Sequence, residues 1–202
     1  MMRFIIIIFF GFYSTFSQSQ ENNTNNLPDS IQENLAFELA RICGFDQGIR
    51  NEHLLRNYGK EMTSILPAVD SLNFDKFIGI IEEYGYPTET LLGKYYGHEC
   101  VKRVGSYILL HNSPRLVEPE IYQLFRNEVL NGRLNADFFA LALDKYYVLY
   151  EKRSLHNSLF KSSPRLKING VCITDKELSD SLRLDIGLPP LEEHEFIYKT
   201  QE

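Results

Sequence analysis

Tryptophan is absent from this sequence, and its 202 residues include only three cysteines and eight prolines. So few cysteines exclude a small domain held together by many disulfide bonds, and so little proline excludes collagen. Intrinsic disorder is excluded as well, because 44% of the residues are hydrophobic and 24% are charged. The chain is therefore long enough and apolar enough for one folded domain.

Basic residues are in deficit, with 21 lysines and arginines against 27 aspartates and glutamates. The chain carries a formal net charge of −6 and has no run of basic residues. Proteins that bind nucleic acids through the phosphate backbone need the opposite balance of charge. We therefore expect no nucleic-acid partner.

Common catalytic and metal-binding signatures are also missing. There is no Gly-x-Ser-x-Gly nucleophile elbow, no glycine-rich phosphate loop, no Cys-x-x-Cys pair and no acidic calcium loop. The pair His98-Glu99 begins like the helix of zinc proteases, but Lys102 stands where the second histidine is needed. His194-Glu195 fails in the same way, with Tyr198 in that place. The sequence thus predicts no cofactor and no bound metal.

The N-terminus has the order of a secretory signal peptide. Arg3 precedes an apolar stretch of about ten residues that ends at Tyr13, and small polar residues follow. This stretch is shorter than the roughly 20 apolar residues of a membrane-spanning helix. Residues 1–17 are therefore predicted to be a signal peptide, cleaved after Ser17 or after Ser19, so that the protein is periplasmic or secreted. An uncleaved N-terminal anchor is the alternative.

The chain that this cleavage leaves is predicted to have no stable membrane span. Residues 18–28 are polar and low in complexity, which predicts a disordered segment. The folded domain is then expected to comprise residues 29–202, without a linker that would divide it in two.

Export changes how the three cysteines are interpreted. An oxidising compartment permits one disulfide bond and one remaining thiol among Cys43, Cys100 and Cys172. Cys43 and Cys100 both fall in predicted helices, where a cysteine often packs as a small apolar residue. The favoured interpretation is therefore three unbridged thiols, with the single bridge as the alternative.

Apolar residues recur three and four positions apart in five stretches, which is the spacing of one helix face. Asp29 or Ser30 can cap the first of these helices, and Gly85 and then Pro87 stop the second. Asn131-Gly132 ends the fourth. We expect helices over residues 29–58, 66–84, 94–111, 118–131 and 135–152.

The C-terminal part has a different pattern. Asn169-Gly170, flanked by alternating apolar residues, predicts a β-hairpin over residues 165–173. Thr174 and Glu177 have the capping-box spacing for a sixth helix that ends before Gly187. The predicted fold class is mainly α, a single-domain helical bundle of about six helices with a small C-terminal β-hairpin.

A few polar residues interrupt or adjoin the apolar stretches. Asp46 and Arg50 lie four residues apart on one predicted helix face, where they form either an exposed ion pair or part of a cleft. His111 ends the third predicted helix, where an imidazole interacts well with free carbonyl groups. Asp144 stands alone in an apolar stretch, which is typical of either a structural carboxylate or a catalytic one.

Six short motifs occur in an order that resembles a family of uncharacterised bacterial proteins, a domain of unknown function. Its members carry Asp-Gln-x-x-Arg, Asp-x-x-Asn, Gly-Trp-Pro, Gln-His, Asp-Arg and Gly-Leu-x-Pro-Leu elements. The matching residues here are Asp46-Gln47-Gly48-Ile49-Arg50, Asp70-Ser71-Leu72-Asn73, Gly85-Tyr86-Pro87, His111, Asp144-Lys145 and Gly187-Leu188-Pro189-Pro190-Leu191.

The chain departs from this family at several positions. Leu110 replaces the glutamine of the Gln-His pair, and Lys145 replaces the arginine of the Asp-Arg pair. A further Gln-x-Tyr-Gly-Thr element is not recognisable around residues 155–158. The resemblance implies a shared fold and, if the family has a polar site, a site altered here, but it implies no activity. The ligand-binding candidates at the matching positions are Gln47, Arg50, Asp70, Asn73 and Tyr86.

These observations favour an exported, non-enzymatic binding or interaction domain whose partner is a small molecule or a protein. The alternative is an enzyme, possibly a hydrolase, with His111 as general acid and base. Asp46 or Asp144 would orient the imidazole, and Arg50 would bind an anionic group. A metal site built from His111, Asp46 and Asp144 ranks third, because it has only one imidazole and no thiolate ligand. We expect Asp46, Arg50 and His111 to line one partly buried pocket.

Overall fold

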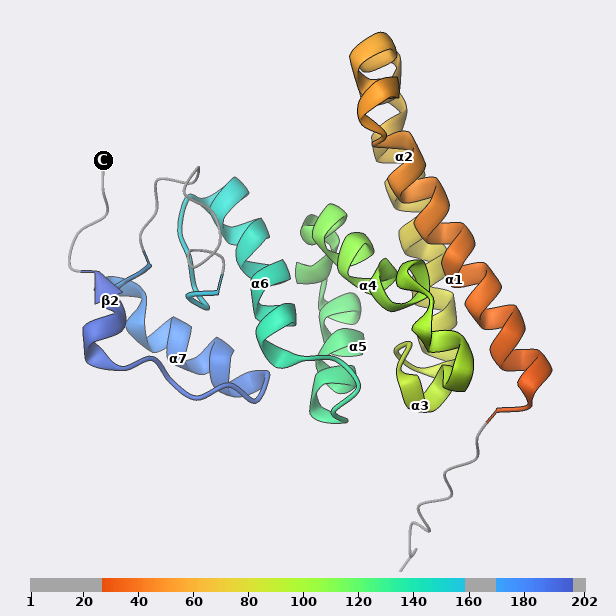
Figure 1. The fold of residues 1–202 in the computed structure, drawn as a ribbon. Helices are drawn as coiled ribbons and strands as arrows, with labels where there is room; N and C mark the ends of the chain where they lie inside the picture. The colour runs from red at the N-terminus through yellow and green to blue at the C-terminus, as the bar shows by residue number, and fades with distance from the viewer. Residues whose placement is uncertain (1–26, 159–169, 198–202) are drawn as a thin grey trace, which may run out of the picture.

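The computed structural model describes residues 27–158 and 170–197, and these residues fold mainly into α-helices, as predicted (Figure 1). The predicted signal peptide and nearly all of the polar segment after it lie outside the described residues. The α-helices are α1 (Asp29–Ile49), α2 (Glu52–Tyr84), α3 (Glu89–Leu92), α4 (Glu99–His111), α5 (Pro119–Leu130), α6 (Ala136–Tyr146) and α7 (Lys176–Asp185).

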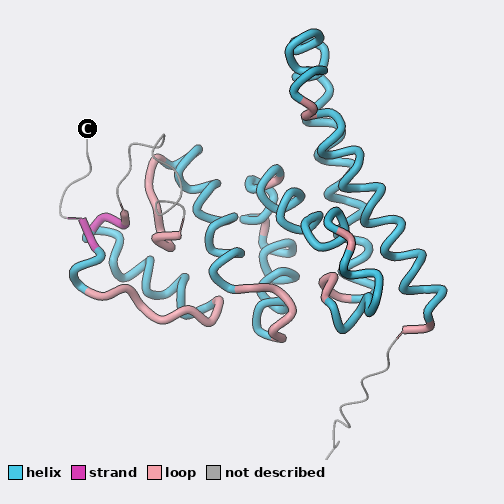
Figure 2. Tube along the Cα trace, in the orientation of Figure 1, coloured by secondary structure: helices cyan, strands magenta, loops and turns pink. Residues whose placement is uncertain are grey.

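The helices lie beside one another along the molecule, with α1 and α2 at one end and α7 at the other (Figure 1). Helix α1 packs against α2 and α4, α2 also packs against α4, and α6 contacts both α4 and α5. Short 3₁₀ turns, Gly93–Gly97 and Ser113–Val117, lie on either side of α4. Figure 2 shows that the connections between the helices are mostly short. Since α1, α2 and α4 touch one another, their ends can bring distant residues together.

One apolar core joins α1 through α6. Its largest fully buried side chains include Phe74 and Phe77 of α2, Phe125 of α5 and Phe139 of α6. Each such side chain contributes about 1.5–3 kcal/mol when it leaves water. A small second cluster near the C-terminus consists of Val171, Leu191 and Phe196.

The boundary between α1 and α2 differs from the prediction. Helix α1 ends at Ile49 instead of continuing to Tyr58, and α2 begins at Glu52 instead of Leu66. The reason is local, because the side chain of Asn51 accepts hydrogen bonds from the amides of His53 and Leu54 and so caps a new helix. At Tyr58 the backbone is non-helical (φ −133°, ψ 33°), which kinks α2.

Other helix ends agree more closely with the sequence. Gly85 terminates α2 with a φ of 86°, a conformation that favours glycine. Helix α5 begins at Pro119 and stops just before Asn131, as expected. Helix α4 starts later than predicted, at Glu99, because Gly93–Gly97 forms a 3₁₀ turn. The helix predicted over residues 135–152 is α6 followed by a π-helical turn, Tyr147–Glu151.

The C-terminal region contains two short strands. Strands β1 (Val171–Cys172) and β2 (Phe196–Ile197) pair in parallel, which a hairpin does not do. Residues 165–169, on the N-terminal side of the predicted hairpin, lie outside the described residues. The predicted capping box is not formed, because the Thr174 hydroxyl donates to the sulfur of Cys172 and α7 begins only at Lys176.

A disulfide bond joins Cys43 of α1 to Cys100 of α4, and Cys172 is a buried free thiol. The expectation of three unbridged thiols was therefore wrong. Both cysteines do face the core, as small apolar residues would, but α1 and α4 pack side by side and bring them together. Closing a loop across 57 residues typically stabilises a fold by about 2–4 kcal/mol.

Within residues 27–158 and 170–197, none of the helices combines the length and the apolar character that crossing a bilayer requires.

Candidate functional site

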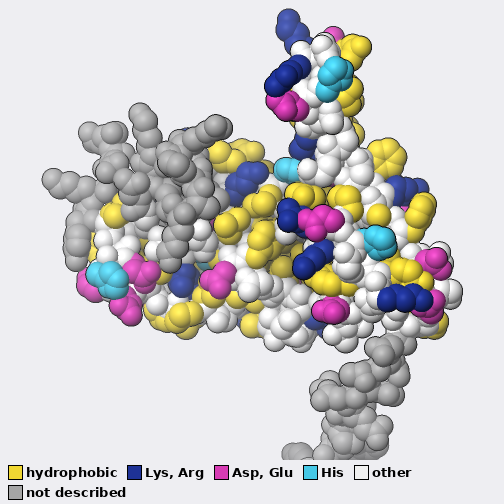
Figure 3. Space-filling model, in the orientation of Figure 1, with side chains coloured by type: hydrophobic (Ala, Val, Ile, Leu, Met, Phe, Trp, Pro, Cys, Tyr) yellow, Lys and Arg dark blue, Asp and Glu magenta, His cyan; other side chains and the backbone are white. Residues whose placement is uncertain are grey.

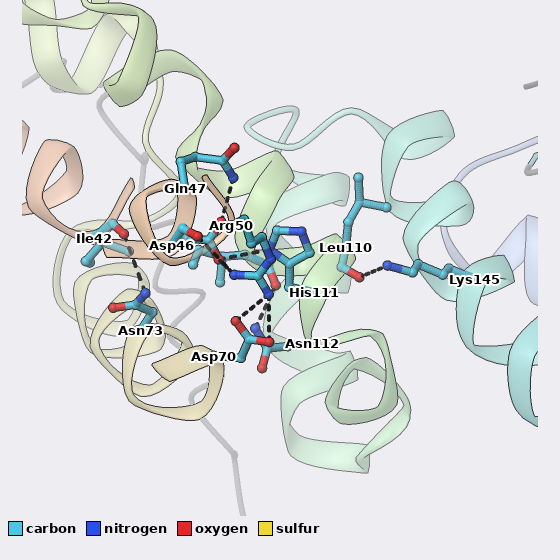
Figure 4. Close-up of polar contacts among 11 residues, drawn as sticks. Ile42, Asp46, Gln47, Arg50, Asp70, Asn73, Leu110, His111, Asn112 and Lys145 are labelled. Atoms are coloured by element: carbon cyan, nitrogen blue, oxygen red, sulfur yellow. Dashed lines mark hydrogen bonds and ion pairs between the residues drawn. The ribbon is translucent and has the colours of Figure 1, made fainter. Parts of the chain in front are cut away.

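Three of the predicted residues meet where the ends of α1 and α4 come together (Figure 4). Asp46 lies in the last turn of α1 and is fully buried. Its Oδ1 atom lies 2.8 Å from Nδ1 of His111 and 3.2 Å from Nη1 of Arg50. One buried carboxylate thus holds an imidazole and a guanidinium group at the same time.

Asp70 of α2 completes the ion pairs. Nη2 of Arg50 donates to both carboxylate oxygens of Asp70, at 2.7 and 2.8 Å. Nη1 of Arg50 also donates to the backbone carbonyl of Asp46, at 3.0 Å. Because Arg50 bridges two carboxylates with both terminal nitrogens, it is fixed in place and ties α1 to α2.

Two further side chains border this cluster. Nε2 of Gln47 donates to the second carboxylate oxygen of Asp46, at 2.6 Å. Lys145 of α6 reaches the end of α4, where its ammonium group donates to the carbonyl of Leu110 at 2.5 Å. Burial lowers the pKa of Lys145, the positive charge of Arg50 lowers it further, and Asp70 opposes the change. We call Asp46, Gln47, Arg50, Asp70, His111 and Lys145 the polar centre.

Local sequence explains how the polar centre is assembled. Asp46 and Arg50 are four residues apart, so they lie on one side of the end of α1. Cys43 is less than one turn before Asp46, and its disulfide bond fixes α1 against α4 close to this point. His111 is the last residue of α4, where the free carbonyl groups favour a cation.

Of the side chains in the polar centre, His111 is the best placed to bind a ligand or to transfer a proton. Its Nδ1 atom faces the buried carboxylate of Asp46, while its side chain remains 22% exposed. A carboxylate at Nδ1 holds the ring in one orientation and favours a proton on that nitrogen. Nε2 is then the nitrogen left to accept a proton or to bind a ligand.

The same atoms meet one criterion for a metal site. Ligand atoms of Asp46, Asp70 and His111 all lie within 4.8 Å of one another. However, the guanidinium group of Arg50 already contacts both of these carboxylates and occupies the space between them. A metal ion would have to displace Arg50, so the geometry favours the ion-pair network.

Asp144 lies outside the polar centre, contrary to the role that two of the hypotheses gave it. It is fully buried, and within the described residues its carboxylate accepts hydrogen bonds from the turn at residues 154–158 alone. Those donors are the hydroxyl of Ser154, the amides of Leu155, His156 and Ser158, and Nδ1 of His156. Asp144 therefore organises a turn of the chain.

The electrostatics of Asp144 agree with this structural role. Burial alone would raise the pKa of Asp144, but hydrogen bonds from His156 and from backbone amides outweigh it and hold the pKa below its ordinary value. The His156 side chain is only 1% exposed, and within the described residues its Nε2 atom has no hydrogen-bond partner. This second carboxylate–histidine pair is closed to solvent.

Asn73 and Tyr86, the other two predicted ligand-binding residues, contribute to the packing of the helices. Asn73 is buried, and its Nδ2 atom donates to the carbonyl of Ile42 at 3.5 Å, which links α2 to α1. The ring of Tyr86 packs edge-on against Phe77, with ring centroids 5.9 Å apart. Its hydroxyl lies against Gly105 so closely that a Cβ atom there would come within 2.1 Å. Burial raises the pKa of Tyr86, and the residue does not belong to the polar centre.

The sequence analysis did not predict the roles of two residues, Asp70 and Lys145. Asp70 was a candidate, but its role as the second partner of Arg50 depends on how α1 and α2 align. Lys145 was noted only as a substitute in the Asp-Arg pair, although it is this basic residue, and not Asp144, that reaches the polar centre.

No protein-family model, no curated protein and no solved structure matches this chain. The resemblance to a domain of unknown function therefore stays a prediction.

Proposed function

We propose that this protein is an exported, non-enzymatic binding protein whose polar centre recognises a small ligand with an acidic group. The observation that carries the proposal is the environment of Lys145. Its ammonium group is half-buried and donates to a backbone carbonyl, and within the described residues it has no carboxylate partner. A half-buried cation without a direct ion-pair partner is destabilising, and an acidic ligand would provide that partner.

The charges around Lys145 support an anionic ligand. Asp46 and Asp70 both form ion pairs with Arg50, and Asp70 only partly opposes the lowering of the Lys145 pKa, so Lys145 lacks a direct ion-pair partner. His111 directly follows Leu110, whose carbonyl group binds Lys145, and its side chain is partly exposed. Its imidazole can donate a hydrogen bond to the same ligand when protonated. The guanidinium group of Arg50 acts here as a fixed support.

Two features support the remaining parts of the proposal. The signal-like N-terminus and the disulfide bond between Cys43 and Cys100 are both compatible with export. Within the described residues, His111 forms a hydrogen bond only with Asp46. No serine, threonine or cysteine there is held against the imidazole as a nucleophile would be, which favours binding over covalent catalysis.

Thermal unfolding with simple anions tests the proposal. Acetate and inorganic phosphate serve as probes, because a ligand that binds only the folded state raises the Tm. We expect at least one of them to raise the Tm of the wild-type protein and to lose this effect in Lys145→Met. Lys102→Met, an exposed lysine on α4, is the matched control and should respond like the wild type. An equal response in Lys145→Met, or none in the wild type, would refute the proposal.

A second candidate is general acid–base catalysis, which the 2.8 Å contact between Asp46 and His111 favours. In this case Nε2 of His111 would take a proton from a water molecule that attacks an ester or phosphoester. Chromogenic esters and phosphoesters provide the assay, with His111→Gln as the decisive variant. Turnover that disappears in His111→Gln and follows the titration of a histidine supports catalysis, whereas turnover that survives excludes His111 as the base.

A further inference from the structure

His111 is the member of the polar centre whose charge changes near neutral pH. A histidine gains or loses a proton between about pH 5 and 8. The side chain of His111 is 22% exposed, so solvent can deliver that proton. The charged groups around it are Asp46 and Arg50 at the end of α1, Asp70 on α2 and Lys145 on α6. Its protonation therefore sets the net charge of the polar centre.

The other elements packed against α4 carry charges that are paired elsewhere. Arg115, in the turn after α4, pairs with Asp75 and Glu118. Lys94, in the turn before α4, pairs with Asp29. Figure 3 shows that basic and acidic side chains often lie next to each other on the face that it draws. Salt screens more distant surface charges within about 8 Å at physiological ionic strength. The charge that a ligand meets is therefore set mainly by the polar centre itself.

The charges of the polar centre balance when the imidazole is neutral. Asp46 and Asp70 contribute two negative charges, and Arg50 and Lys145 contribute two positive ones. Protonated His111 adds a third positive charge, so the centre then carries a net charge of +1. An unbalanced charge costs more free energy in a half-buried site than in water. One negative charge on a ligand thus restores the balance only when His111 is protonated.

The geometry of His111 acts in the same direction. Asp46 favours a proton on Nδ1, so neutral His111 presents the lone pair of Nε2, which repels a carboxylate oxygen. Protonated His111 presents an N–H group there, which donates to that oxygen. Lys145 reaches the carbonyl group of Leu110, the residue before His111, so a second cation lies beside this donor (Figure 4).

Provided that the polar centre binds an acidic ligand, as proposed above, we infer that it binds this ligand together with one proton on His111. The proton comes from solvent and goes to Nε2, and no covalent bond of the ligand breaks. Ligand binding and protonation of His111 then favour each other by the same factor. The ligand binds more tightly in mildly acidic solution than at about pH 8.

NMR of the histidine side chains in the complete chain tests this coupling, because it follows binding and protonation together. Acetate is the probe, with sodium chloride at equal ionic strength as the blank. Acetate keeps its negative charge between about pH 5.5 and 8, where a histidine titrates. We expect the Kd for acetate to be about tenfold larger at pH 8 than at pH 5.5. Saturating acetate should raise the midpoint of the His111 titration by about one pH unit.

Two variants separate the coupling from other effects of pH. His111→Gln keeps a hydrogen-bonding side chain but has no titrating group, so its Kd for acetate should be the same at both pH values. His98→Gln changes an exposed histidine at the other end of α4 and is the matched control. It should show the pH dependence of the wild type.

Failure of the coupling and failure of the ligand site give different results. Wild-type protein that binds acetate equally at both pH values, with an unmoved His111 midpoint, would refute the coupling and leave the site intact. This measurement needs no variant. Wild-type pH dependence that survives in His111→Gln would also refute it, because another group would carry the proton. Wild-type protein that binds neither acetate nor phosphate at any pH would overturn the proposed function and this coupling together.

Discussion

Two buried carboxylates in this protein are each paired with a histidine, but they differ in access to solvent. Asp46 and Asp144 are both fully buried. Nδ1 of His111 lies 2.8 Å from Asp46, and Nδ1 of His156 lies 3.2 Å from Asp144. The side chain of His111 is 22% exposed and that of His156 only 1%, so only His111 can meet a molecule from solvent.

The other partners of the two carboxylates differ as well. Asp46 is held by side chains, and its partner Arg50 also binds Asp70 on another helix. Asp144 is held mostly by backbone amides of one turn, at residues 155, 156 and 158. Backbone amides cannot rotate away or exchange partners without unfolding the turn. The comparison indicates that the same pair of groups serves the fold at Asp144 and can serve binding at Asp46.

The largest effect is expected at Asp144. Asp144→Ala leaves the amides of the 154–158 turn and the imidazole of His156 buried without their acceptor, which should lower the free energy of unfolding by about 3–5 kcal/mol. Denaturation in urea measures this loss. Asp137→Ala, an exposed aspartate on the same helix, is the control and should change stability by less than about 1 kcal/mol. A loss at Asp144 no larger than that of the control would contradict the structural role.

Acid provides a second readout of the same carboxylate. The hydrogen bonds that hold the pKa of Asp144 below its ordinary value of 3.8 make the folded state release this proton more readily than the unfolded chain. This stabilisation is complete above the unfolded pKa and is lost as the pH falls through the lower folded pKa. In Asp144→Asn, the decline in stability below pH 3.8 should be shallower than in the wild type.

A smaller effect is expected in the polar centre. Asp46→Ala leaves Arg50 with Asp70 as its remaining carboxylate and His111 without an anion, so we expect a loss of about 3 kcal/mol. Arg50→Ala and the double mutant complete a thermodynamic cycle. Because Asp46 and Arg50 are in contact, their effects should not add. Two nearly neutral single mutants with additive effects would show that the pair contributes nothing beyond a surface ion pair.

The parts of the fold that could be predicted are those that short-range rules decide. Gly85 has a backbone conformation that favours glycine, and Pro119 stands at the first helical position, where proline is favoured. The end of α2 and the start of α5 could therefore be predicted from the sequence. The break after α1 could not be predicted in this way, because Asn51 caps a new helix inside the stretch that was expected to form one helix over residues 29–58. Nor could the disulfide bond, since its formation depends on which helices lie side by side.

The polar centre was partly predictable for the same reason. Asp46 and Arg50 are a local pair, and their spacing on one helix face was sufficient to identify them. Helix geometry explains why Lys145, and not Asp144, reaches the polar centre. Neighbouring residues on a helix point about 100° apart, so one side chain of α6 turns to the 154–158 turn and the next reaches α4. A sequence motif locates such a pair but does not tell which member enters the site.

The smallest effect, and one of opposite sign, is expected for Lys145→Met. Burial and the charge of Arg50 lower the pKa of Lys145, so the folded state holds this proton less tightly than the unfolded chain. The charged lysine therefore costs stability at neutral pH, and the cost diminishes as the pH rises from the folded pKa toward the ordinary value of 10.5. Lys145→Met should raise the free energy of unfolding at pH 7 by less than about 1 kcal/mol, and this gain should shrink as the pH approaches 10.5. Lys102→Met should show neither change. If Lys145→Met instead destabilises the protein, Lys145 supports the fold as Asp144 does, and the distinction between the two regions no longer holds.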